Sequence, residues 1–126
     1  MLHRIRLELA RTRDFPDGST RHGYELVAPL TADGHLDEEA WKKVRQVCTV
    51  HRFWAGEGDA TGQLVRTRRG RWSLSYEAGE DDDEPIHRLE DHRFAEGEYV
   101  SIREHDGEVR PFKVVHVRPA PGLGEG

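Results

Sequence analysis

Two β-rich segments near the carboxyl terminus constrain the fold of this chain most strongly. Tyr99–Arg103 alternates apolar and polar side chains, and a second β-rich run extends over Val109–Val117. Between them stands Asp106-Gly107, a dipeptide typical of the tight turns that join antiparallel strands. The stretch Phe94–Val117 therefore predicts a hairpin that supplies two neighbouring strands of a small sheet.

The register of this hairpin follows from the residues that must share its buried face. A two-residue turn would bury the wrong side chains, whereas a three-residue loop ending at a left-handed Gly107 places Val100 opposite Phe112. We expect this second register. Val109 is out of phase with Phe112, so we also expect a bulge or an edge position near Pro111.

Upstream segments show the same period-two alternation, which is typical of half-buried strands. The single strands are predicted over Leu2–Ala10, Tyr24–Leu30 and Cys48–Trp54, and a second hairpin over Gln63–Thr67 and Arg71–Glu77. Consecutive hairpins make a sheet antiparallel, so we expect antiparallel pairing throughout.

One segment has the pattern of a helix, over about Glu38–Val47. Asp37 precedes it as a capping residue, and two glutamates follow at the positive end of the helix dipole. Trp41, Val44 and Cys48 form an apolar stripe at helical spacing. We expect this stripe to lie against the sheet.

The predicted fold class is therefore α+β, mostly antiparallel β. We expect a small curved sheet or partly open barrel of six to seven strands, with one covering helix. The 126 residues suffice for one domain, which we place at residues 1–118. Residues 119–126 form a Pro/Gly tail that we expect to be disordered.

Composition limits where the protein works and what it binds. No apolar run approaches the ~20 residues of a membrane span, and Met1–Ala10 alternates instead of forming a signal peptide. Cys48 is the single cysteine, which excludes an internal disulfide and a multi-cysteine zinc site. We therefore expect a cytoplasmic protein without a membrane partner.

The formal net charge of −5 comes from one segment, Glu77–Glu84, which contains six carboxylates. Contiguous acids repel one another and lack the spacing and the glycine of a calcium loop, so a solvated loop is the better interpretation. His87 and His92 are five residues apart, a spacing that suits neither face of a helix or strand. We expect no metal site and no cofactor.

An arginine-rich hairpin is the best candidate for binding an anion or a nucleic acid. Arginine engages phosphates in bidentate fashion, and an exposed aromatic ring stacks on a base. The alternative is a solvated hairpin whose arginines meet the acidic segment and whose tryptophan lies in the core. The candidate residues are Arg66, Arg68, Arg69, Arg71 and Trp72.

No catalytic motif stands out in the sequence. Cys48 ends the apolar stripe of the helix, where a buried thiol is more typical than a reactive one. Histidines and carboxylates are numerous enough to assemble a general acid/base pair in space. Trp54, Tyr76 and Tyr24 are either core residues or the lining of a ligand pocket at a barrel mouth.

The combination of HGYELVAPL, RFW, RWSLSY and FAEGEYVSI resembles a set of short bacterial proteins without an assigned function. The resemblance covers most of the chain and implies no catalytic or binding residues. We therefore expect a small non-catalytic binding or interaction module whose partner is a protein or a small ligand. The alternatives are weak nucleic-acid binding through the arginine-rich hairpin and a small enzyme that uses a His/carboxylate pair.

Overall fold

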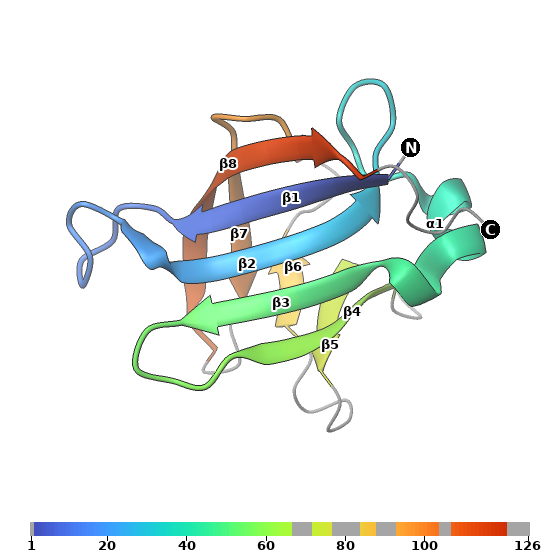
Figure 1. The fold of residues 1–126 in the computed structure, drawn as a ribbon. Coiled ribbons are helices and arrows are strands. Elements are labelled where there is room, and N and C mark those ends of the chain that lie inside the picture. The colour runs from blue at the N-terminus through green and yellow to red at the C-terminus, as the bar shows by residue number, and fades with distance from the viewer. Residues whose placement is uncertain (1, 67–71, 77–83, 88–92, 104–106, 121–126) are drawn as a thin grey trace.

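The computed structural model describes residues 2–66, 72–76, 84–87, 93–103 and 107–120. Within these residues eight strands surround a common core, and a helix lies at one end (Figure 1). The elements are β1 (Leu2–Leu9), β2 (Ser19–Pro29), α1 (Glu38–Val44) with a 3-10 turn (Arg45–Val47), β3 (Thr49–Trp54), β4 (Ala60–Arg66), β5 (Trp72–Tyr76), β6 (Glu84–His87), β7 (Tyr99–Arg103) and β8 (Val109–Pro119).

The strands pair antiparallel in chain order, and β1 also pairs with β8, so the described strands form a closed barrel. Seven strands make a strongly curled sheet, from β7 through β8 and β1 to β5. The short β6 closes the ring with two residue pairs on each side. The predicted class, α+β and mostly antiparallel β with one helix, is confirmed, and β6 is one strand more than the six or seven expected.

The barrel interior is filled by side chains, as in other small barrels. On β1 the apolar positions Ile5, Leu7 and Leu9 all face inward, as their alternation predicts. The largest fully buried side chains come from seven strands and from the segment before β7. They are Tyr24, Phe94, Phe112, Ile5, Leu7, Leu26, Leu64, Leu74, Ile102, Val50 and Val100.

The carboxyl-terminal hairpin has the predicted register. Val100 pairs with Phe112, and Gly107 has a φ of +85°, which is the left-handed conformation expected of it. The expected bulge or edge position near Pro111 is wrong in both forms. The ladder between β7 and β8 is regular, β8 is also paired with β1 at this point, and Val109 faces solvent. The irregularity of β8 lies in its other ladder, the one with β1.

The helix begins where the sequence predicts. The Asp37 carboxylate accepts a hydrogen bond from the Ala40 N–H at 3.1 Å, which satisfies one of the free amides of the first turn. Trp41 anchors the helix to the barrel: its Nε1 donates to the Leu64 carbonyl at 3.0 Å, and its ring meets Trp72 edge-on. The helix therefore covers one end of the barrel (Figure 1).

Three strands extend beyond the predicted limits. β2 begins at Ser19 instead of Tyr24, and β8 continues through Pro119. A third strand, β4, also begins early, at Ala60 instead of Gln63. The N–H of Ala120 then donates to the Leu2 carbonyl at 2.9 Å, so the ordered chain passes the predicted boundary at residue 118. Residues 121–126 lie outside the described residues. In the part of the chain that the structure describes, no helix is long and apolar enough to cross a membrane.

Candidate functional site

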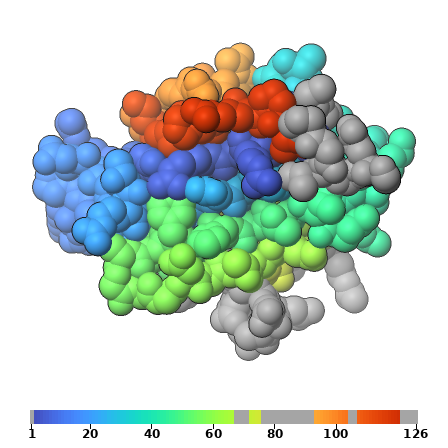
Figure 2. Space-filling model, viewed as in Figure 1, coloured from blue at the N-terminus to red at the C-terminus, as the bar shows by residue number. Residues whose placement is uncertain are grey.

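A groove of about 900 Å³ lies on the outer face of the curled sheet, over β8, β1, β2, β3, β4 and β5. Figure 2 shows this face, with strands from both ends of the sequence side by side. The lining consists largely of the outward-facing residues that alternate with the core, such as Arg4 and Arg6 on β1. We call this concavity the outer groove.

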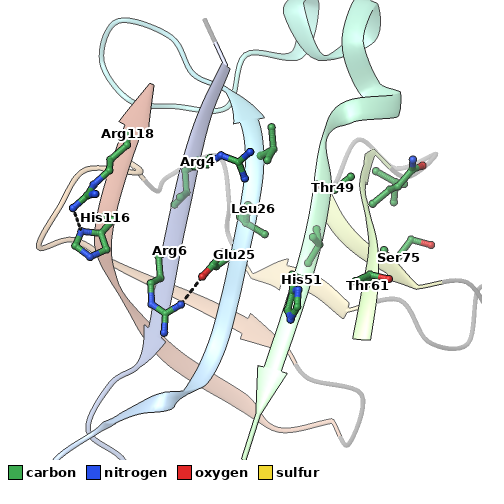
Figure 3. Close-up of a pocket in the computed structure, with 16 residues that line it drawn as sticks. Arg4, Arg6, Glu25, Leu26, Thr49, His51, Thr61, Ser75, His116 and Arg118 are labelled. Atoms are coloured by element: carbon green, nitrogen blue, oxygen red, sulfur yellow. Dashed lines mark hydrogen bonds and ion pairs between the residues drawn. The ribbon is translucent and has the colours of Figure 1, made fainter. Parts of the chain in front are cut away.

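The two sides of the outer groove differ in chemistry (Figure 3). The β1 and β8 side carries guanidinium and imidazole groups, from Arg4, Arg6, His116 and Arg118. The β3, β4 and β5 side carries mostly neutral polar groups, from Thr49, Thr61, Gln63 and Ser75, together with His51. A molecule lying across the strands would therefore meet cations at one end and neutral hydrogen-bonding groups at the other.

Arg6 is held in place by carboxylates of the same sheet face. Its guanidinium lies 2.7 Å from Glu8 and 2.5 Å from Glu25, and it stacks 4.3 Å over the ring of Phe53. Burial alone would lower the pKa of Arg6, but the hydrogen bonds to Glu8 and Glu25 outweigh it and raise that pKa. The charge of Arg6 is thus already compensated within the protein.

Arg4 and Arg118 are arranged differently. They stand directly opposite each other in the ladder between β1 and β8, where like charges are destabilising. Within the described residues, no carboxylate forms an ion pair with either of them. Figure 3 shows the Arg4 side chain reaching over β2, whereas Arg118 lies beside His116 and donates to its Nδ1 at 3.3 Å.

One histidine of the outer groove has a carboxylate partner. The Nε2 of His51 lies 2.9 Å from the Asp59 carboxylate, and both side chains are about half exposed. This is the His/carboxylate arrangement that the sequence left open for a small enzyme. A carboxylate in this position orients the imidazole ring and fixes which nitrogen faces the groove.

The arginine-rich hairpin is only partly within the described residues. Trp72 is 5% exposed and packs against Trp41, so its ring is not free to stack on a base. Arg66 lies 4.9 Å over that ring and pairs with Glu38 of the helix at 3.1 Å. The remaining predicted residues lie outside the described residues, so binding by this hairpin stays a prediction; they are Arg68, Arg69 and Arg71.

The thiol of Cys48 is buried, as the sequence predicts. Burial raises its pKa to about 11, and the thiol donates to the Val44 carbonyl at 3.5 Å. It is therefore protonated and unreactive at neutral pH.

The side chains that the sequence raised as possible metal ligands are not among those that the structure describes. The His87 side chain, His92 and the acidic residues 77–83 fall outside the described residues. Among the residues that are described, no three of His, Cys, Asp and Glu gather as metal ligands would. The prediction of no metal therefore stays a prediction.

Two of the three aromatic residues considered for a pocket at the barrel mouth, Tyr24 and Trp54, pack against the core. Tyr24 is fully buried with its ring 5.2 Å from that of Phe112. Trp54 contacts Phe112 and the ring of His22. The side chain of Tyr76 lies outside the described residues.

Sequence reasoning missed the outer groove. Its residues are the polar members of alternating strands, which the pattern assigns to solvent without saying which of them are neighbours. The only available signal was that two of the outward-facing positions of β1 are arginines. That signal acquires meaning only once β8 and β2 are known to flank β1.

Comparison with known proteins finds no protein family, no curated protein and no solved structure that matches this chain. The resemblance to short bacterial proteins therefore stays a prediction. What the groove does has to be inferred from its geometry and charge.

Proposed function

We propose that this protein is a non-catalytic binding module that holds a small anionic ligand in the outer groove. The observation that carries the proposal is Arg4, a cation without a described carboxylate partner that reaches into a concavity of ligand size. Ligand pockets typically measure about 300–1,000 Å³ and contain a few polar groups that fix orientation.

The charge of the outer groove is opposite to that of the chain. The chain carries −5 in all, whereas the described residues that line the groove include three arginines, two histidines and one carboxylate, Glu25. That carboxylate is already paired with Arg6. The groove therefore concentrates positive potential, which attracts anions and raises their local concentration.

The groove also has the rigidity that a binding site needs. Its side chains stand on paired strands, whose backbones are held by ladders on both sides. Ordering such a site costs little on binding, so more of the interaction energy appears as affinity. A cytoplasmic location, in keeping with the single cysteine, is part of the same proposal.

Amide NMR titrations test this function. We expect citrate and inorganic phosphate to shift resonances of Arg4, His51 and Arg118 saturably at low salt, and glycerol to shift none. Arg4→Gln should weaken anion binding, whereas Arg103→Gln, an equal charge change at an exposed position of β7, should leave it unchanged. Equal losses in both variants would show non-specific attraction and end the proposal.

A second candidate function, a small enzyme, is favoured by one observation. His51 lines the outer groove and is oriented by Asp59 at 2.9 Å, so it is placed to act as a general base on a bound ligand. The expected signature is turnover that falls in both His51→Gln and Asp59→Asn while anion binding persists.

Hydrolysis of 4-nitrophenyl acetate and 4-nitrophenyl phosphate by the wild-type protein checks this candidate. Turnover that depends on His51 and Asp59 would replace the non-catalytic proposal. Saturable binding without turnover, or turnover that survives both substitutions, would leave the binding module ahead.

A further inference from the structure

We infer that the ligand of the outer groove is a phosphorylated sugar or a similar polyol phosphate. Its phosphate lies at Arg4 and Arg118, and its hydroxyl groups extend over β2 toward β3, β4 and β5. This inference rests on the proposed binding function and names the ligand class of the same groove.

The phosphate-binding end of the groove is indicated by two arginines that are paired with each other in one ladder and have no described carboxylate partner. Side chains directly opposite in an antiparallel pair have Cβ atoms about 5 Å apart, so one phosphate can contact both Arg4 and Arg118. In the structure the two guanidinium groups point away from each other, in keeping with their like charge (Figure 3). A dianion removes that repulsion and accepts bidentate hydrogen bonds from each guanidinium.

The hydroxyl end is indicated by a row of neutral polar side chains across three strands. Thr49 pairs with Gln63 in the β3–β4 ladder, and Gln63 pairs with Ser75 in the β4–β5 ladder. Next to this row, His51 pairs with Thr61. Hydroxyl and amide groups both donate and accept hydrogen bonds, which is the complement that sugar hydroxyls require.

The spacing of the two ends suits one small molecule. Arg4 on β1 is separated from Thr49 on β3 by two strand spacings, about 10 Å, and from Gln63 on β4 by three, about 14 Å. The Arg4 side chain covers part of this distance by reaching over β2 (Figure 3). A hexose phosphate bridges this span, whereas inorganic phosphate reaches only the cationic end. The ligand should therefore gain affinity from both sides at once.

The lining argues against a nucleotide. Among the described residues that line the groove there is no Phe, Tyr or Trp. Sites that hold a nucleobase generally supply an aromatic face on which it stacks. The nearest aromatic ring of this sheet face, Phe53, is already covered by Arg6 at 4.3 Å.

Calorimetric titration with four probes at low salt tests the inference. We expect glucose 6-phosphate to bind more tightly than inorganic phosphate or AMP, and glucose to give no measurable binding. Parallel amide NMR titrations should map the first two probes to Arg4 and Arg118, and glucose 6-phosphate also to Thr49 and Gln63.

Three variants separate the two ends of the site. The double variant Arg4→Gln/Arg118→Gln should weaken glucose 6-phosphate and inorganic phosphate alike, by about tenfold or more, because charge-assisted hydrogen bonds are lost. Gln63→Ala should weaken glucose 6-phosphate about threefold to tenfold and leave inorganic phosphate unchanged. Arg103→Gln is the control and should alter neither. All these positions are exposed or half-buried, so the variants should fold, which an NMR spectrum confirms.

Each contrary outcome has a distinct meaning. Equal affinity for glucose 6-phosphate and inorganic phosphate, or tighter binding of AMP, would overturn the sugar-phosphate inference while leaving anion binding in the groove intact. An affinity for glucose 6-phosphate that is unchanged by the Arg4/Arg118 substitutions would overturn the inference as well. If no anion shifts any groove resonance, the inference and the proposed function both fail.

Discussion

The inner and outer faces of β1 differ in how completely their side chains find partners within the protein. Inward-facing Ile5, Leu7 and Leu9 are each at most 3% exposed and belong to the hydrophobic core. Outward-facing Arg4 and Arg6 share the same strand, yet among the residues that the structure describes only Arg6 has carboxylate partners. The side chains of the inner face hold the barrel together. On the outer face, the guanidinium of Arg4 retains hydrogen-bonding groups that folding does not use.

The largest difference between the faces should appear when side chains are truncated. Leu7→Ala leaves a cavity in a filled interior and should lower the free energy of unfolding by about 3 kcal/mol. Thr61→Ala, on the outer groove, should change it by less than about 0.5 kcal/mol. Urea denaturation of both variants measures this. Comparable losses would mean that the groove is part of the structural core.

A second difference concerns space for added atoms. Gly23 lies where β1 and β2 approach closely, and a Cβ there would stand 2.0 Å from the Leu7 carbonyl oxygen. Gly23→Ala should therefore cost about 2 kcal/mol or more, because the strands must shift apart. Gly58→Ala meets nothing within 4 Å and should be neutral or slightly stabilising. Thermal unfolding compares the two; equal melting temperatures would contradict the close approach.

The barrel end opposite the helix holds a buried histidine. His22 lies between the rings of Phe15 and Trp54, with its Nδ1 2.6 Å from the Ser19 hydroxyl. Burial lowers the pKa of His22, and the charges of Arg21 and Arg52 lower it further, against an opposing effect of Glu57. The folded protein therefore favours the neutral ring.

This histidine predicts a loss of stability in mild acid. Below the ordinary histidine pKa of about 6.5, the unfolded chain binds a proton that the folded chain resists, so stability falls as pH drops. Urea denaturation between pH 7.5 and 5.5 should show this fall. His22→Phe keeps a ring but cannot titrate, so it should flatten the dependence relative to His116→Gln, an exposed control. An unchanged slope in His22→Phe would refute this assignment.

The smallest change in the free energy of unfolding should come from the outer groove itself, and it should be a gain in stability instead of a loss. Arg118→Gln removes the like charge opposite Arg4 and should raise the free energy of unfolding by a few tenths of a kcal/mol at low salt. The gain should shrink as salt screens the charges. Denaturation at low and high salt measures it. A loss of stability would show that Arg118 has a structural role that the proposal denies it.

Much of the fold could be predicted because local patterns carry it. The register of the last hairpin followed from which residues had to share a face with Phe112, and Gly107 adopted the required conformation. The helix start followed from the capping residue Asp37 and the two glutamates after it. The early start of β2 was missed because Ser19–Gly23 lacks alternation; close approach to β1, with Gly23 at the contact, extends the strand.

The candidate site was much less predictable. The arginine-rich hairpin drew attention because its charges are adjacent in sequence, yet Trp72 belongs to the core and Arg66 pairs with the helix. Arg4 and Arg118 stand at opposite ends of the chain and gave no such signal. Their opposition depends on the pairing of β1 with β8.

By itself, the sequence determined which side of each strand is buried, where the helix begins and how the last hairpin is aligned. These features depend on backbone periodicity and on single residues with restricted conformations, both of which act over a few neighbours. Only the tertiary structure decided which outward-facing side chains meet. Barrel closure joins the first strand to the last and sets groove residues from six strands side by side, and no local pattern encodes which distant strands become neighbours.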